Sequence, residues 1–178
     1  MMATELTLRT CVSGDEGSLS LVGQATFLET FAGILGGIDI VTHCSEAHAI
    51  EVYRTWLHDP NYALWLVECN PGTAPVGYMV VAPPHLPLPD TTRDLELKRI
   101  YLLGRFQRGG LGKRLVSAAV TYSIAAGAKR LLLGVYAHNE PAIGFYKHLG
   151  FSKLGTRKFH IGDNDYDDDI MSKSLNTK

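Results

Sequence analysis

The sequence predicts a single α/β domain built on a mixed sheet. Two strand-like runs are joined by a hairpin connection before the middle of the chain, and strands alternate with helical segments after it. Such alternation is typical of α/β folds, in which helices connect parallel strands across a sheet. The 178 residues, 46% hydrophobic and 20% charged, suffice for one core of good size. We therefore expect residues 1–178 to form one domain.

The N-terminal third is expected to hold one strand and two helices. Residues 5–9 alternate between apolar and polar types, as a short strand does. Apolar residues at helical spacing predict a helix over 18–34, stopped by the Gly-Gly pair at 36–37. A second helix is expected over 45–57, with Ser45 as its N-terminal cap.

Two strands and a proline-rich segment follow. Residues 62–68 and 76–82 are strand-like, and the Asn-Pro-Gly-Thr-Ala-Pro segment at 70–75 suits a hairpin connection. Residues 83–90 contain four prolines. Proline lacks an N–H donor and fixes φ, so this segment cannot be a helix interior or a central strand. We expect a loop that is long enough to cover a site.

The second half alternates strands with helices. Strands are expected over 95–103, 130–136, 151–161 and 170–174, and helices over 111–126 and 141–149, the last with Gly150 just beyond it. Together with the N-terminal elements, this gives a mixed sheet of about seven strands flanked by about four helices.

The composition excludes several classes of function. The net charge is −1, so the overall electrostatics indicate neither a nucleic-acid nor an anionic-membrane partner. The three cysteines show no CxxC spacing and no histidines at zinc-ligand distances, and we predict no metal site. No basic and apolar leader precedes the first strand, and no run approaches the ~18 apolar residues of a membrane span. We expect a cytoplasmic protein.

The segment IYLLGRFQRGGLGKRLV at 100–116 places glycines and cations between a strand and a helix. The first N–H groups of a helix lack partners and attract anions, and glycines permit close approach by a ligand, so this turn suits a pyrophosphate. The P-loop pattern fails, because Gln107 stands where its first glycine would be and Arg114 where its hydroxyl residue would be. The dinucleotide pattern GxGxxG fails at Leu115.

Two motifs do fit one family. The turn QRGGLG at 107–112 matches Q/R-x-x-G-x-G/A, and NEPAIGFYKHLGF at 139–151 matches N-x-x-A-x-x-F/L-Y-x-x-x-G-F. In this order and at this separation, they resemble the signatures of the GCN5-related N-acetyltransferase (GNAT) superfamily. The resemblance implies that the turn binds the pyrophosphate of acetyl-CoA and that the preceding strand pairs with the pantetheine arm. The implied acetyl-CoA-binding residues are Ile100, Tyr101, Leu102, Leu103, Gln107, Arg108, Gly109, Gly110, Leu111, Gly112, Lys113, Asn139, Ala142, Phe145 and Tyr146.

Acetyl transfer to an amine needs a base, a polarised thioester carbonyl and a proton for the leaving thiolate. By the resemblance, Tyr146 is the general acid, and a backbone amide near Leu102 polarises the carbonyl. Glu96, eleven residues before Gln107, has the spacing of the general base in several family members. An alternative is that Glu96 pairs with a neighbouring cation and that ordered water deprotonates the amine. On an unbroken strand, Glu96 and Lys98 would share one face.

The acceptor is less closely specified. Residues 27–31, 95–101 and 159–173 are similar to bacterial spermine/spermidine N-acetyltransferases, which implies a polyamine or another small amine. A protein or peptide N-acetyltransferase and a non-catalytic acyl-CoA-binding regulatory module remain open, and the resemblance also implies a possible homodimer. The acidic run at 163–169 lacks the glycine and glutamate of a calcium loop, so we expect a solvated hairpin turn there.

Overall fold

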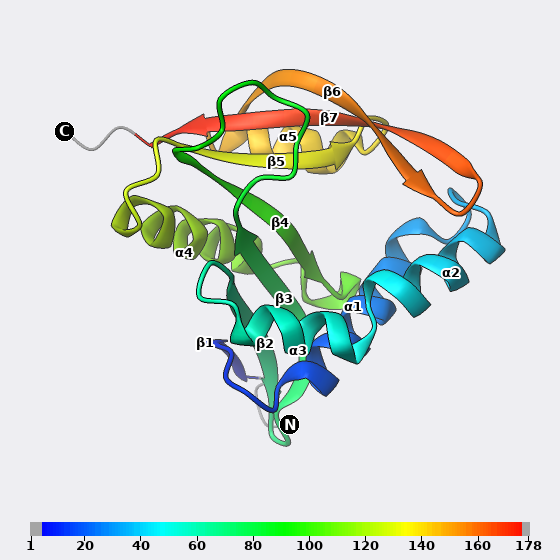
Figure 1. The fold of residues 1–178 in the computed structure, drawn as a ribbon. Coiled ribbons are helices and arrows are strands. Elements are labelled where there is room, and N and C mark those ends of the chain that lie inside the picture. Colours follow the sequence, from blue (N-terminus) through cyan, green and yellow to red (C-terminus); the bar gives the residue numbers. More distant parts are fainter. Residues whose placement is uncertain (1–4, 176–178) are drawn as a thin grey trace.

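The computed structural model describes residues 5–175, whose seven strands form one sheet in the order β1-β2-β3-β4-β5-β7-β6. All neighbouring strands are antiparallel except β4 and β5, which are parallel. This confirms the predicted mixed sheet (Figure 1). The strands are β1 (Glu5–Thr10), β2 (Ala63–Asn70), β3 (Ala74–Ala82), β4 (Asp94–Leu102), β5 (Arg130–Tyr136), β6 (Ser152–Ile161) and β7 (Asn164–Ser174).

Helices cover both faces of this sheet. They are α1 (Glu16–Phe31), α2 (Gly37–Ala47), α3 (Ile50–His58), the 3-10 turn η1 (Gly104–Phe106), α4 (Leu111–Ala125) and α5 (Glu140–His148). On one face, Leu19 of α1 and Tyr53 of α3 are buried in a cluster with Val80 of β3. On the other face, Leu115 of α4 and Ile143 of α5 belong to the largest apolar cluster. No helix within 5–175 is long and apolar enough to cross a membrane.

The helix predicted over 45–57 was wrong, because two helices, α2 and α3, occupy this region. The chain breaks at Ala49, whose φ of −61° and ψ of 147° are extended. The break is held by burial of the preceding residue: the carbonyl of His48 accepts a hydrogen bond from Ser20 Oγ at 2.6 Å. Ser45 is not a cap but lies inside α2. The described residues contain five α-helices, close to the expected number of about four.

Of the acidic run, Asp163 alone lies in a hairpin turn, together with Gly162. The other residues of the run belong to β7, which begins at Asn164 rather than at 170, and three of its carboxylates pair with cations of β6. Lys158 bonds Asp167, Arg157 bonds Asp168 at 3.1 Å, and Lys153 bonds Asp169. These cross-strand pairs offset the repulsion between the carboxylates, which explains why so acidic a segment is a strand.

The proline-rich segment is a loop, as predicted. Its Leu86 is 7% exposed and packs with Leu88 against Leu132 of β5 and Ile170 of β7. Leu131 and Leu133, the neighbours of Leu132, belong to the cluster on the α4 face. Since side chains alternate along a strand, the loop covers the opposite face of the sheet.

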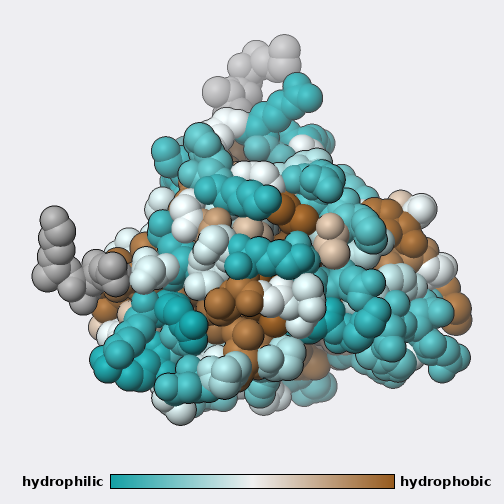
Figure 2. Space-filling view, turned by 90° about the horizontal axis from the view of Figure 1, so that it is seen from above, coloured by the Kyte–Doolittle hydropathy of each residue, from teal (hydrophilic) through white to brown (hydrophobic). Residues whose placement is uncertain are grey.

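Exposed apolar side chains gather at one end of the molecule. Figure 2 shows them in brown at the edge formed by α2. Ile34, before α2, is 50% exposed, and Ile38 and Val41 of α2 are 74% and 60% exposed. Ile34 also lines the cavity described below, so this apolar surface borders one end of that cavity.

Candidate active site

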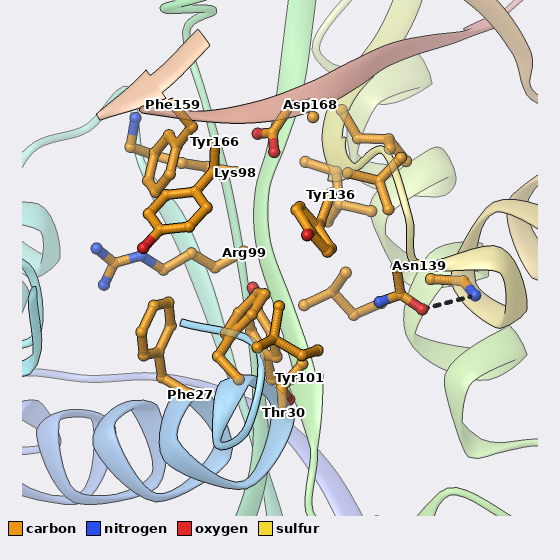
Figure 3. Close-up of a pocket in the computed structure, with 18 of the residues that line it drawn as sticks. Phe27, Thr30, Lys98, Arg99, Tyr101, Tyr136, Asn139, Phe159, Tyr166 and Asp168 are labelled. Atoms are coloured by element: carbon orange, nitrogen blue, oxygen red, sulfur yellow. Dashed lines mark hydrogen bonds between the residues drawn. The ribbon is translucent and has the colours of Figure 1, made fainter. Parts of the chain in front are cut away.

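The site is a cavity of about 1100 Å³ that opens where β4 and β5 diverge. The two strands pair only from Asp94 to Glu96 on β4 and from Arg130 to Leu132 on β5. Beyond these residues, the separated strands form two walls, and residues from α1, α2, α5, β6 and β7 complete the lining. Figure 3 shows side chains from several of these elements directed into the space between the strands.

The edge of β4 that faces the gap carries free backbone groups. Antiparallel neighbours bond at every second residue. Since the N–H of Leu103 donates to Val76 O of β3 at 2.9 Å, the N–H and C=O of Leu102 point away from β3 and toward the gap. Gln107 Nε2 donates to the carbonyl of Leu102 at 3.0 Å. Gln107 thus ties the following turn to the strand, while the N–H of Leu102 is directed into the cavity.

The glycine-rich turn leads into α4 with left-handed backbone. Gly109 and Gly110 have φ of 103° and 79°, a region that favours glycine. No side chain caps α4, so its first N–H groups are available to an anion. A Cβ at Gly112 would lie 3.3 Å from the ring of Phe145 in α5. The small residue therefore lets the start of α4 approach α5 at the cavity wall.

Helix α5 places an amide and a phenol on this wall. Asn139 is the N-cap of α5, and its side-chain oxygen accepts a hydrogen bond from the N–H of Ala142 at 3.2 Å. Tyr146, two turns later, is 9% exposed and packs edge-on against Phe151. Burial, with a contribution from Tyr101, raises the pKa of Tyr146 well above its ordinary value. The phenol is therefore protonated at neutral pH and can act as a proton donor.

Comparison with known proteins shows the family of the chain. The model of the acetyltransferase (GNAT) family matches residues 34–151. An uncharacterised N-acetyltransferase of Mycobacterium tuberculosis is 35% identical over 123 residues, which are 69% of this chain and 74% of that protein. The chain belongs to the acetyltransferase (GNAT) family. An uncharacterised N-acetyltransferase of Lactobacillus delbrueckii is 38% identical over 81 residues, and the match spans 46% of this chain and about half, 47%, of that relative.

Solved structures share the fold of this GNAT acetyltransferase. The PaiA N-acetyltransferase of Thermoplasma acidophilum, in complex with coenzyme A, superposes with a TM-score of 0.75 at 20% identity, covering 96% of this chain and 99% of that one. An acetyltransferase of Salmonella typhimurium, with acetyl-CoA, gives 0.67 at 17% identity, covering 98% and 96%. At this level of identity, the likeness concerns the fold, including its mixed sheet.

The structure of the GNAT acetyltransferase brings most of the predicted site residues together. Those that line the cavity are Glu96, Ile100, Tyr101, Leu102, Gln107, Gly112, Asn139, Ala142, Phe145 and Tyr146. Those outside its lining are Leu103, Arg108, Gly109, Gly110, Leu111 and Lys113. Within the second set, Leu111 is 3% exposed in the core, and the N–H of Leu103 is bonded to β3. Leu111 can therefore contact acetyl-CoA only through its backbone. Leu103 cannot contact it through its N–H.

Glu96 lies at the closed end of the cavity. It is 2% exposed, and its Oε2 accepts a hydrogen bond from the N–H of His85 at 2.8 Å, in the proline-rich loop. The loop itself does not line the cavity. The simple alternation expected along β4 is also broken, because the register shifts between Leu97 and Arg99 and makes Lys98 an extra residue. Glu96 and Arg99 thus face the same side of the sheet.

Several aromatic residues at the end of the cavity away from Asn139 had no role predicted from the sequence. Phe27 and Phe31 come from α1, Tyr136 from β5, Phe159 from β6 and Tyr166 from β7. In Figure 3, Phe27, Phe159 and Tyr166 lie on the side of the cavity away from Asn139, and Lys98 and Arg99 extend from β4 toward them. These residues come from elements far apart in the chain, so no local spacing indicates that they meet.

Two histidines of this end are held neutral. Burial, with a smaller contribution from the Arg99 guanidinium, lowers the pKa of His43 to about 4 and that of His48 to about 2. Arg99 itself donates to Tyr53 Oη and to the carbonyl of Ala47, each at 2.8 Å. The guanidinium therefore ties β4 to the junction of α2 and α3. Arg99 thus places a fixed positive charge beside two neutral imidazoles at this wall.

Proposed function

We propose that this GNAT acetyltransferase transfers the acetyl group of acetyl-CoA to a primary amine of a small molecule, by direct attack in a ternary complex. The observation that carries the proposal is the convergence of Gln107, Gly112, Asn139 and Tyr146 on one cavity between diverging strands. Such a cavity admits two substrates from opposite ends. The amine can then reach the thioester carbonyl without a covalent enzyme intermediate.

Acetyl-CoA is assigned to the end formed by β4, α4 and α5. Its pyrophosphate would accept hydrogen bonds from the first N–H groups of α4 at the glycine-rich turn. The pantetheine arm would lie along the free edge of β4, where the N–H of Leu102 can donate to the thioester carbonyl. Tyr146 would then donate a proton to the departing thiolate.

The acceptor is assigned to the end bounded by α1, α2 and β6. Its rings, Phe27, Phe31 and Phe159 among them, suit the apolar part of a small amine or the cation–π recognition of an ammonium group. A polyamine, as the sequence resemblance implies, is the first acceptor to test. Glu96 lines the cavity and stays a candidate base, and the homodimer stays a prediction that sedimentation analysis would check.

The proposal is tested by measuring release of the CoA thiol from acetyl-CoA with a panel of amines. The panel contains spermidine, spermine, aminoglycosides, amino acids and peptides with a free N-terminus or lysine. Saturable release with one class of small amine is the expected result. Preference for extended peptides would favour a protein acetyltransferase. Binding of acetyl-CoA without release by any amine would instead indicate a regulatory acyl-CoA-binding protein.

A further inference from the structure

A third carboxylate, Asp168 of β7, lines the cavity besides Glu29 and Glu96. The residue is 7% exposed, and it pairs with Tyr136 of β5 on one side and with Arg157 of β6 on the other. Figure 3 shows its carboxylate directed into the space above Tyr101 and beside Tyr136. Arg157 Nε and Nη2 both bond the same oxygen, Oδ2, at 3.1 Å. The guanidinium therefore fixes the carboxylate and leaves Oδ1 to face the cavity.

Its position along the strands places Asp168 closer to the open part of the cleft than Glu96. Glu96 is opposite Leu132, the last residue of β5 that pairs with β4. Asp168 is opposite Tyr136, four residues further along β5, which corresponds to about 13 Å. Because Lys98 is an extra residue, the same advance along β4 reaches Tyr101, next to Leu102 and its free N–H. Asp168 is thus level with the place assigned to the thioester, whereas Glu96 is near the apex.

The surroundings of Asp168 suit a proton acceptor of moderate basicity. Burial raises the pKa of this carboxyl, while the facing Arg157 of β6 opposes the rise. From β4 it faces Tyr101, whose pKa burial raises to about 12 with a smaller contribution from Asp168, and from β5 it faces Tyr136. Its neighbours on β7, Asp167 and Asp169, raise the pKa slightly further.

We propose that Asp168 is the catalytic base of this acetyltransferase: Oδ1 binds the ammonium group of the acceptor and removes its proton. The assignment rests on the proposed function. The proton passes from the ammonium nitrogen to the carboxylate, and the freed nitrogen lone pair forms the C–N bond with the thioester carbonyl. The C–S bond breaks, and the thiolate takes a proton from Tyr146. The nitrogen of the adduct loses its second proton, which returns the Tyr146 phenolate to the phenol. The products are the N-acetyl amine and CoA thiol, and the protonated carboxyl then loses its proton to solvent.

The test compares Asp168→Asn with Asp167→Asn, the same chemical change one residue away. The side chain of Asp167 is 58% exposed, bonds Lys158 and lies on the other face of β7. With the best amine of the panel, Asp168→Asn should lower kcat at least about 100-fold, since a general base contributes roughly 10²–10⁴-fold. Asp167→Asn should keep the wild-type rate. The Kd of acetyl-CoA, measured by calorimetry, should be unchanged in both.

A second variant addresses folding and role together. In Asp168→Ala, sodium formate should restore part of the rate by supplying a carboxylate in the vacated space. The acidic limb of the wild-type pH–rate profile, due to protonation of Asp168, should be lost in Asp168→Asn. The assignment of Asp168 would be overturned if a folded Asp168→Asn kept more than about a third of the wild-type kcat, or if formate did not restore Asp168→Ala. Neither result would affect the proposed function. A wild-type protein that binds acetyl-CoA but acetylates no amine would overturn the proposed function and the assignment with it.

Discussion

The hydroxyl oxygen of Tyr53 lies 2.8 Å from Nδ1 of His48, and both side chains are buried beneath α1. This pair occupies the space that a side chain at position 23 of α1 would need. A Cβ at Gly23 would lie 2.4 Å from His48 Nδ1 and 2.5 Å from Tyr53 Oη. The contact fixes how closely α1 approaches the α2–α3 junction, and through it the acceptor end of the cavity.

Gly23→Ala is expected to destabilise the protein by roughly 1–3 kcal/mol, since the added methyl group overpacks a buried polar pair. Denaturant unfolding followed by circular dichroism measures the change. The matched control is Gly17→Ala in the same helix, where nothing lies within 4 Å of the added Cβ. That substitution should be neutral or slightly stabilising, because alanine favours helix more than glycine does. Equal stabilities of the two variants would contradict the close approach.

The free energy of unfolding should fall as the pH drops from about 6.5 to about 4. His43 has an ordinary pKa of 6.5 that is lowered to about 4 in the folded protein, mainly by burial. In this window, the unfolded chain binds a proton that the folded chain does not, so acid favours unfolding by up to about 1.4 kcal/mol per pKa unit. His43→Phe, which keeps the ring stacked on Phe27, should reduce this fall. Urea unfolding at several pH values measures the effect. An identical pH dependence of the free energy of unfolding in the wild type and in His43→Phe would contradict the role of His43.

Tyr146→Phe should lower kcat by about 10²-fold or more while leaving the Kd of acetyl-CoA unchanged, because only the proton for the thiolate is removed. Steady-state thiol release and calorimetry give the two quantities. Tyr122→Phe in α4 is the control: this ring packs edge-on against Trp65 and lies outside the cavity lining. Undiminished turnover in Tyr146→Phe would remove the phenol from the mechanism.

Two variants of Asn139 distinguish its role as a helix cap from its proposed role in binding acetyl-CoA. Asn139→Ala removes the acceptor for the N–H of Ala142 and should cost about 1 kcal/mol of stability. Asn139→Asp keeps an acceptor oxygen and should keep the stability. Both lose the amide N–H donor in the cavity, so both should raise the KM for acetyl-CoA. If Asn139→Asp leaves that KM unchanged, the residue is a helix cap alone.

Local pattern was sufficient for elements whose signals lie within a few residues. The hairpin between β2 and β3, the run of β5, and α5 with the left-handed Gly150 after it were all predicted closely. The pattern failed where distant contacts decide. The break between α2 and α3 depends on the buried His48. Its carbonyl is bonded by Ser20 of α1, and its ring by Tyr53 of α3. The early start of β7 depends on the cations of β6.

By itself, the sequence determined the fold class and the family, because the alternation of strands and helices and two short motifs are local features of the chain. The same two motifs predicted the residues that we propose to bind acetyl-CoA. Only the tertiary structure brought together the half of the cavity that we propose for the acceptor. Its wall joins Phe27, Arg99 and Asp168 from α1, β4 and β7, which meet only because β4 and β5 diverge and β7 pairs beside β5. A bulge at Lys98 and an ion pair to Arg157 then set which charged groups face the cavity, and neither follows from spacing along the chain.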